Sequence, residues 1–151
     1  MNARLQHAAR KRLLFVDDNR EVTRVLQKIA CEGPNPEFEF VGSLPSADTL
    51  VTQVARLRAE GRCPDLITLD LAMPGKPAID ALRDALQECP DIKVIIYSGV
   101  DNAGRVREAL ATGAVGYVLK SSDDPWEIVR ALRIVAAGDR YVSESVKGAV
   151  S

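Results

Sequence analysis

Four short, mostly apolar runs, each followed at once by a polar or charged residue, constrain the fold of this chain more than any other feature. The runs and the residues that follow them are Leu13–Val16 before Asp17 and Asp18, Leu66–Leu69 before Asp70, Val94–Tyr97 before Ser98, and Tyr117–Leu119 before Lys120. Runs of this kind are typical of strands that a parallel sheet buries on both faces. In an open α/β sheet, ligands bind at the carboxyl ends of the strands. We therefore expect these polar side chains to meet at one edge.

Amphipathic stretches separate the runs and predict helices between the strands. Between Arg20 and about Ala30, apolar residues recur with the i, i+3, i+4, i+7 spacing of one helix face. Further helices are expected over about 46–61, 77–87, 102–113 and 124–138, and a weaker strand over 38–41. Five strands alternating with five helices predict an α/β fold, with a doubly wound five-stranded parallel sheet and helices on both faces.

Several of these helices carry sequence signals at their ends. Ser46 and Asn102 are expected N-caps, and Gly113 is expected to end the helix that precedes it. The segment from Asp124 to Glu127 combines an N-cap, a proline at the first helical position and a glutamate three residues after the cap. This pattern predicts a capping box at the start of the last helix.

Length and composition favour one cytoplasmic domain with its own core. A chain of 151 residues fits one domain, and a net charge of -1 argues against general attraction to nucleic acid or membranes. No apolar run approaches membrane-spanning length, and no signal-peptide core follows the basic first residues. Cys31, Cys63 and Cys89 form no metal-binding spacing and are expected to be small buried thiols in a reducing cytosol.

Three carboxylates at the predicted edge indicate a metal site. Asp17, Asp18 and Asp70 converge if the strands that precede them are neighbours. Like charges about 4 Å apart repel by roughly 4 kcal/mol at an effective dielectric constant of about 20, so such a cluster needs a cation. Oxygen ligands favour a hard divalent ion, and we expect Mg²⁺. The alternative, that the acids cap a helix, is serious for one of the adjacent pair but explains Asp70 poorly.

Asp70 is the candidate nucleophile of a phosphoryl transfer at this edge. A carboxylate can attack phosphorus to form an acyl phosphate, and catalysis of that step is mainly positioning and charge neutralisation. Lys120 would supply a second positive centre, and Ser98 could donate a hydrogen bond to a phosphoryl oxygen. Taken singly, Ser98 also fits a turn residue and Lys120 a solvated lysine. Their joint occurrence with acids at the other strand ends favours the site.

Four motifs stand in a fixed order along the chain: Asp17-Asp18, Asp70-Leu-Ala-Met-Pro, Ser98-Gly99 and Tyr117-Val-Leu-Lys120. Together they resemble the receiver domain of bacterial two-component response regulators, over about residues 12–137. The resemblance implies a flavodoxin-like fold with strand order 2-1-3-4-5. It also implies that a sensor histidine kinase or a histidine phosphotransfer protein phosphorylates Asp70. The domain would then be a self-phosphorylating acceptor with autodephosphorylation, rather than an enzyme that turns over a free substrate.

The resemblance also assigns metal ligands and a switch. The ligands of Mg²⁺ would be Asp18, Asp70 and the backbone carbonyl of Ala72, with Asp17 acting largely through water. Tyr117 matches the family's aromatic switch position, although from the residues alone an ordinary strand aromatic is favoured. Phosphorylation would draw Ser98 toward the phosphoryl group and let Tyr117 turn inward. The output face, which could also form a homodimer, would comprise the helix from about Ala103, the strand ending at Lys120 and the last helix.

The closing stretch is similar to the NarL/FixJ subgroup in particular. It reads Gly116-Tyr-Val-Leu-Lys-Ser and then Ala137-Gly-Asp-Arg-Tyr-Val-Ser. In that subgroup a linker leads into a DNA-binding domain. We therefore expect a basic flexible arm over 1–11, the receiver domain over 12–137 and a tail or linker over 138–151. No DNA contact by this chain itself and no membrane attachment are expected, and an excised receiver and a single-domain regulator both stay open.

Two positions depart from many relatives, which carry polar side chains there. Ala72 and Val100 lie two residues past Asp70 and Ser98, where a polar group can orient the water that hydrolyses the acyl phosphate. We hypothesise that the apolar side chains slow autodephosphorylation.

Two other functions compete with this interpretation. An aspartate-nucleophile phosphatase of the haloacid-dehalogenase type normally ends its first strand in two acids spaced two apart, whereas Asp17 and Asp18 are adjacent. A more credible alternative is a pseudo-receiver, which would act as a phosphorylation-independent protein-protein interaction module. The complete acidic set argues against it.

Overall fold

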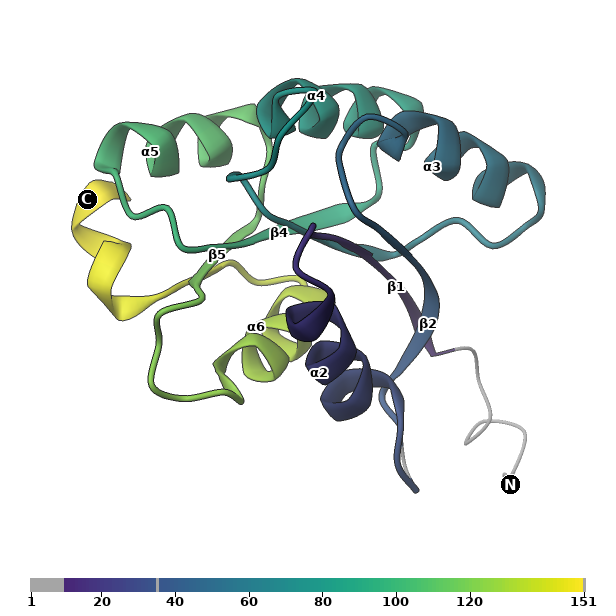
Figure 1. Ribbon diagram of the computed structural model, residues 1–151, viewed down its shortest axis with the longest axis horizontal. Helices are drawn as coiled ribbons and strands as arrows, with labels where there is room; N and C mark the ends of the chain where they lie inside the picture. Colours follow the sequence, from purple (N-terminus) through teal and green to yellow (C-terminus); the bar gives the residue numbers. More distant parts are fainter. Residues whose placement is uncertain (1–9, 35, 151) are drawn as a thin grey trace.

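The computed structural model describes residues 10–34 and 36–150, and every predicted strand and helix is present (Figure 1). The strands are β1 (Lys11–Val16), β2 (Phe38–Leu44), β3 (Leu66–Leu69), β4 (Lys93–Ser98), β5 (Gly116–Leu119) and β6 (Tyr141–Val142). The helices are α2 (Arg20–Cys31), α3 (Leu50–Ala59), α4 (Ala78–Glu88), α5 (Ala103–Thr112), α6 (Glu127–Ala136) and the 3-10 helix η1 (Glu144–Val150). Among the described residues, no helix combines the length and apolar composition needed to cross a membrane.

The sheet is parallel throughout, in the order β2-β1-β3-β4-β5-β6. This confirms the predicted order of the first five strands. The sheet has one strand more than the sequence predicts, because β6 pairs with β5 and places Tyr141 beside Gly116 and Val142 beside Tyr117. A strand of two residues is too short to show a period in the sequence.

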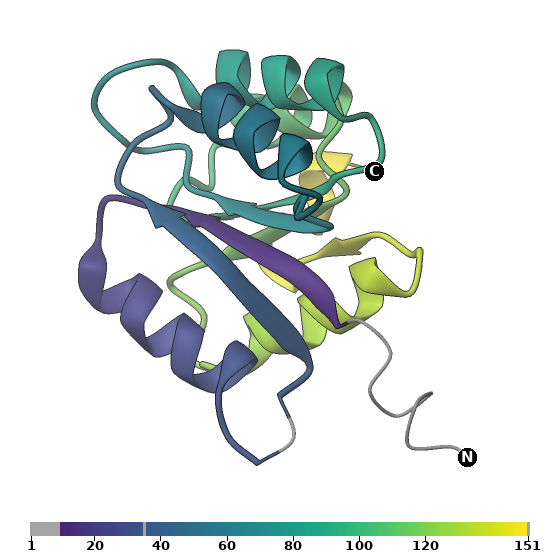
Figure 2. The ribbon, with the colours of Figure 1, turned by 90° about the vertical axis from the view of Figure 1, so that its right-hand side faces the viewer.

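Helices cover the sheet in two layers, with α2 and α6 on one face and α3, α4 and α5 on the other (Figures 1 and 2). Side chains of successive strand residues point to opposite faces. Accordingly, Leu14 and Ile67 belong to the core under α3, α4 and α5, whereas Leu13 and Leu66 belong to the core under α2 and α6. Burying each such side chain stabilises the fold by roughly 1.5–3 kcal/mol. The apolar runs are therefore strands buried on both faces.

The predicted helix ends are correct in two cases and wrong at the start of α3. Asn102 caps α5 by accepting a hydrogen bond from the amide of Arg105, and Gly113 ends that helix with a φ of 129°. Ser46 is not the N-cap of α3, which begins at Leu50. The Ser46 hydroxyl instead accepts a hydrogen bond from the amide of Asp48 in the turn before the helix.

The predicted capping box of the last helix is also wrong. α6 begins at Glu127, and the carboxylate of Asp124 accepts a hydrogen bond from the amide of Trp126 before the helix starts. The Glu127 carboxylate does not return to the helix end, because it accepts hydrogen bonds from the hydroxyl groups of Tyr141 and Ser143. A tertiary contact thus replaces the local one.

Residues 138–150, here called the C-terminal segment, pack against the sheet and α5. The segment contains β6 and η1, drawn at the yellow end of the chain in Figure 1. Val146 of η1 is 4% exposed and lies in the same core as Val106 of α5, and Arg107 donates a hydrogen bond to the carbonyl of Ala149. The stretch expected to be a tail or linker therefore covers the edge of β5. Most of the predicted basic arm, residues 1–9, lies outside the described residues.

Candidate functional site

Three carboxylates meet where β1 and β3 end side by side. Asp17 and Asp70 are only 6% and 5% exposed, whereas Asp18 is open to solvent. Each can offer one carboxylate oxygen to a cluster in which these atoms lie within 4.8 Å of one another. The backbone fixes this arrangement, because the amide of Asp70 donates to the carbonyl of Val16 at 3.0 Å. The structure thus brings together the three acids that the sequence singled out.

Lys120 reaches the same cluster from the end of β5. Its Nζ lies 2.6 Å from Oδ2 of Asp17 and 2.9 Å from Oδ2 of Asp70. If all four groups are ionised, the three carboxylates and one ammonium leave two uncompensated negative charges. That charge, with oxygen donors alone, matches what a hard divalent cation requires.

Burial and pairing pull the pKa values at this site in opposite directions. Burial raises the pKa of Asp17 above its ordinary value, and the hydrogen bonds from Lys120 and the amide of Asn19 offset this only in part. Burial lowers the pKa of Lys120, but hydrogen bonds to Asp17 and Asp70 outweigh it, so that the pKa of Lys120 is raised. The ammonium is therefore held in its charged form by the two carboxylates.

Helix capping does not explain the acidic pair. The N-cap of α2 is Asn19, whose side chain accepts hydrogen bonds from the amides of Glu21 and Val22. Asp17 instead accepts the amide of Asn19 through Oδ1 and contacts Lys120 through Oδ2. The alternative that one of the acids caps the helix is therefore wrong.

Ser98 and Tyr117 are both hydrogen-bonded to Val100. The Ser98 hydroxyl, fully buried at the end of β4, accepts a hydrogen bond from the amide of Val100 at 3.2 Å. The Tyr117 hydroxyl donates to the carbonyl of the same residue at 2.5 Å. Tyr117 is fully buried, and burial raises its pKa to about 12. The tyrosine ring thus already lies inside the protein, and one loop residue joins the two candidate switch side chains.

The loop after β3 is held from two sides. The amide of exposed Ala72 donates to Oδ1 of Asp70 at 3.0 Å. Further along, the amide of Lys76 donates to Oδ1 of Asp48 at 2.7 Å. A Cβ atom on Gly75, which has a φ of 94°, would lie 2.7 Å from the same oxygen, so this close approach requires glycine. Sequence reasoning missed Asp48, because 28 residues separate it from its partner.

Two adjoining hollows connect Lys120 to α2. The first, of about 140 Å³, is lined by Lys120, and both hollows share Tyr97, Pro125 and Ile128. The second, of about 210 Å³, is mostly apolar and is lined by Val22, Val25, Leu26 and Ile29 of α2. The ammonium of Lys120 lies 5.9 Å from the centroid of the Tyr97 ring. Val25, which lines the second hollow, exposes 43% of its surface. Trp126, which follows Pro125 in the sequence, exposes 51%.

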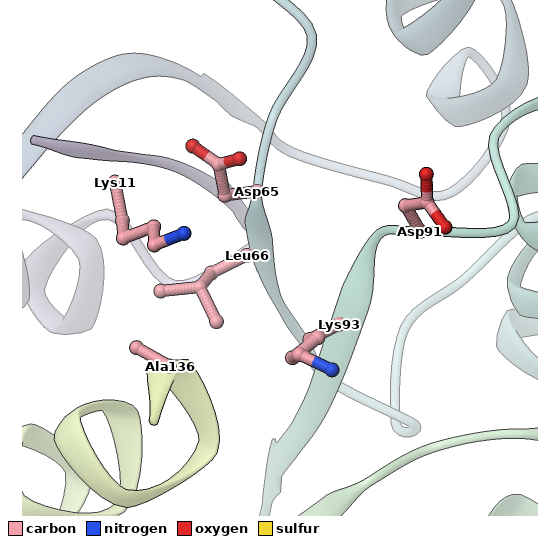
Figure 3. Close-up of a pocket in the computed structure, with 6 residues that line it drawn as sticks. All are labelled: Lys11, Asp65, Leu66, Asp91, Lys93 and Ala136. Atoms are coloured by element: carbon pink, nitrogen blue, oxygen red, sulfur yellow. The ribbon is translucent and has the colours of Figure 1, made fainter. Parts of the chain in front are cut away.

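Charged residues also gather at the opposite edge of the sheet, but they do not form a comparable site. Figure 3 shows Lys11 of β1, Leu66 of β3 and Lys93 of β4 around a cavity of about 50 Å³. Asp65 beside them accepts a hydrogen bond from the amide of Arg12 at 2.8 Å. A cavity of this size holds only a few water molecules. The acidic edge is therefore the better candidate.

Comparison with known proteins agrees with the geometry. The family model of the response regulator receiver domain matches residues 13–133. This chain belongs to that family. Among curated relatives of this receiver domain, the transcriptional regulatory protein DegU of Brevibacillus brevis is 31% identical over 134 residues, which are 89% of this chain and 53% of DegU. The response regulator GacA of Pseudomonas viridiflava is 32% identical over 139 residues, which are 89% of this chain and 59% of GacA.

The receiver domain thus spans little more than half the length of these two relatives. By contrast, it covers 98% of the chemotaxis protein CheY of Thermotoga maritima, at 29% identity over 126 residues and 83% of this chain. Among solved structures, a LuxR-family two-component response regulator from Aurantimonas sp. SI85-9A1 has a TM-score of 0.78 and 28% identity, covering 94% of this chain and 96% of that one. These matches establish a receiver domain with the flavodoxin-like fold.

Proposed function

We propose that this receiver domain accepts a phosphoryl group on Asp70 from a phosphohistidine of a sensor histidine kinase or a histidine phosphotransfer protein. The observation that supports this most is the position of the Asp70 carboxylate, buried 2.9 Å from the Lys120 ammonium and within the three-acid cluster. In the transfer, an oxygen of Asp70 forms a bond to phosphorus as the bond between phosphorus and the histidine nitrogen breaks. The electron pair leaves with the imidazole.

The residues present fit Mg²⁺. Asp18, Asp70 and the carbonyl of Ala72 would hold the ion directly, and Asp17 would act largely through water. The fit rests on the oxygen donors within 4.8 Å and on the two negative charges that Lys120 leaves uncompensated. Bound there, Mg²⁺ supplies charge neutralisation for the phosphoryl oxygens.

The protein's own side chains have distinct roles in this proposal. Lys120 neutralises a phosphoryl oxygen beside Asp70, and Ser98 donates a hydrogen bond to another. Ala72 and Val100 present no polar side chain that could orient a hydrolytic water. We therefore expect the acyl phosphate to be long-lived, which suits an acceptor that transmits a signal.

The switch in this proposal passes through Val100. When the Ser98 hydroxyl turns to a phosphoryl oxygen, it gives up the amide of Val100, which it otherwise binds at 3.2 Å. The loop that also holds the Tyr117 hydroxyl is then free to move. Tyr117 lies in β5, so a change at Asp70 can reach that strand, which pairs with the edge strand β6, through two hydrogen bonds.

The output proposed is the face formed by α5, β5 and α6, with the C-terminal segment lying on it. The amide of Ser143 donates to the carbonyl of Tyr117 at 2.9 Å, and the amide of Leu119 donates to the Ser143 hydroxyl at 3.1 Å. The strand that carries the switch therefore holds the segment directly. The same face could bind an output domain, a partner or a second copy in a homodimer.

The phosphodonor partner is proposed to dock over the two hollows between Lys120 and α2. A partner that brings a phosphohistidine to Asp70 must bind beside the acidic edge, and exposed Val25, which lines the second hollow, offers apolar contact area there.

We also propose a cytoplasmic location for the domain, because the kinase domains of sensors act in the cytoplasm.

The test is the intact mass of the protein after incubation with a small phosphodonor such as acetyl phosphate. We expect a gain of one phosphoryl group in the wild type with Mg²⁺, and none with a chelator or in Asp70→Ala. A wild type that gains nothing from the small donor and nothing from phosphorylated kinases would support a pseudo-receiver instead.

A further inference from the structure

Two cysteines that are 26 residues apart in the sequence meet on the face covered by α3, α4 and α5. Cys63 lies in the loop before β3, and Cys89 caps the end of α4. Their sulfur atoms are 3.2 Å apart, and both side chains are partly exposed. The third cysteine, Cys31, ends α2 and packs on the opposite face of the sheet. The sequence, which shows no spacing pattern, gave no sign of this pair.

We infer that Cys63 and Cys89 form an oxidation site that closes to an intramolecular disulfide. A disulfide bond measures about 2.05 Å, so the two sulfurs need to approach by only about 1.2 Å. Side-chain rotation can supply such a movement. A further contact joins the end of α3, which precedes Cys63, to the end of α4, which precedes Cys89. Arg58 of α3 donates hydrogen bonds to both the carbonyl and the carboxylate of Glu88.

The chemistry balances with a low-molecular-weight disulfide such as oxidised glutathione. One cysteine thiolate attacks a sulfur of the oxidant, whose S–S bond breaks and releases one glutathione, which takes up the proton lost by the cysteine. The second cysteine then displaces the glutathione from the mixed disulfide, and a second reduced glutathione leaves with its proton. Burial and the hydrogen bond with Cys89 raise the pKa of Cys63 to about 12, so the exchange is faster in alkaline buffer.

The site is independent of phosphorylation. Cys63 precedes β3 and Asp70 follows it, so the pair lies toward the opposite edge of the sheet from the acidic cluster. Its consequence is for stability, since the bond closes a loop of 26 residues and restricts the unfolded chain. We expect oxidation to raise the Tm by several degrees.

The test uses the intact protein with oxidised glutathione, followed by alkylation of free thiols and mass measurement. We expect wild type to lose two alkylatable thiols and two hydrogen atoms without retaining glutathione, and a reductant to reverse this. A tryptic map should join Cys63 to Cys89. Cys31→Ser is the matched control and should behave like wild type, apart from its missing thiol.

Three outcomes overturn the inference. They are a wild type that keeps all its thiols, one that carries glutathione on both Cys63 and Cys89, and one whose disulfide includes Cys31 or joins two chains. In Cys63→Ser and Cys89→Ser, the remaining thiol should stop at the mixed disulfide, and the Tm should not rise. A Tm rise in these variants would count equally against it.

Discussion

Replacing Glu127 with glutamine tests what holds the C-terminal segment to the sheet. Glu127 is 8% exposed, and its Oε2 accepts hydrogen bonds from the hydroxyl groups of Tyr141 at 2.7 Å and Ser143 at 2.9 Å. Glutamine keeps the shape but removes the charge. Hydrogen bonds to a charged group are worth roughly 1.5–3 kcal/mol each and neutral ones about 1 kcal/mol, so the two weakened bonds together cost about 2 kcal/mol.

The assay measures both local and global opening. Amide hydrogen exchange at Tyr141 and Ser143 reports detachment of the segment, and a loss of about 2 kcal/mol corresponds to roughly 30-fold faster exchange. Urea unfolding reports the global free energy, which falls by up to the same amount if the segment opens only with the whole domain. The matched control is Glu144→Gln, because Glu144 lies in the same segment and its ion pair with Lys147 is at the surface. We expect that variant to change stability by less than about 0.5 kcal/mol.

The reasoning would be refuted if Glu127→Gln left both exchange and unfolding within the range of the Glu144→Gln control. In that case the segment would be held by the backbone bonds of β6 and by the packing of η1 alone.

Three further predictions concern the acidic edge. Burial lowers the pKa of Lys120, but its hydrogen bonds to Asp17 and Asp70 outweigh this and raise the pKa above the ordinary 10.5. The contribution of the Lys120 ammonium to the free energy of unfolding is therefore complete below that pH and is lost as the pH rises through the raised pKa. Lys120→Met should therefore lower the free energy of unfolding by about 3 kcal/mol at neutral pH without Mg²⁺, and the difference from wild type should shrink in alkaline urea titrations. Mg²⁺ at 100 times its Kd should stabilise wild type by about 2.7 kcal/mol and so raise its Tm. Asp18→Asn should lose most of that rise in Tm, whereas Asp123→Asn, which changes an exposed carboxylate, should keep it. Equal rises in both variants would argue against Asp18 as a ligand. Ala72→Asn should shorten the phosphoryl half-life several-fold in a time course of intact mass, and an unchanged half-life would reject the role assigned to the apolar side chain.

The sequence predicts the parts of this protein that local patterns encode. β1, β3, β4 and β5 each lead to a polar or charged residue, such as Asp70 or Lys120, that the apolar run before it makes conspicuous, and parallel strands carry these residues to one edge. The alternation of runs and amphipathic stretches predicted a doubly wound parallel sheet, whereas the order of the five strands came from the resemblance to receiver domains. The prediction of a cation site at this edge followed from residue types, because three carboxylates this close repel one another unless positive charge neutralises them, whereas its metal ligands and switch came from the resemblance.

The sequence did not predict contacts between residues that are distant along the chain. Glu127 matched a capping box locally, yet two hydroxyl groups 14 and 16 residues away bind it instead. β6 has two residues and no period, and its place in the sheet depends on β5. Two further contacts join segments more than 20 residues apart. They are the hydrogen bond from the amide of Lys76, in the loop after β3, to Asp48 and the contact between the sulfur atoms of Cys63 and Cys89. Such pairs are fixed by topology rather than by neighbouring residues.

The most direct test of the central claim is to locate the phosphoryl group. Protein treated with acetyl phosphate and Mg²⁺ is reduced with borohydride, which converts an aspartyl phosphate to homoserine, and is then mapped by peptide mass spectrometry. The account predicts homoserine at position 70 and at no other acid of the cluster. Homoserine at position 17 or 18 in place of 70, or no homoserine in protein that has gained a phosphoryl group, would contradict it.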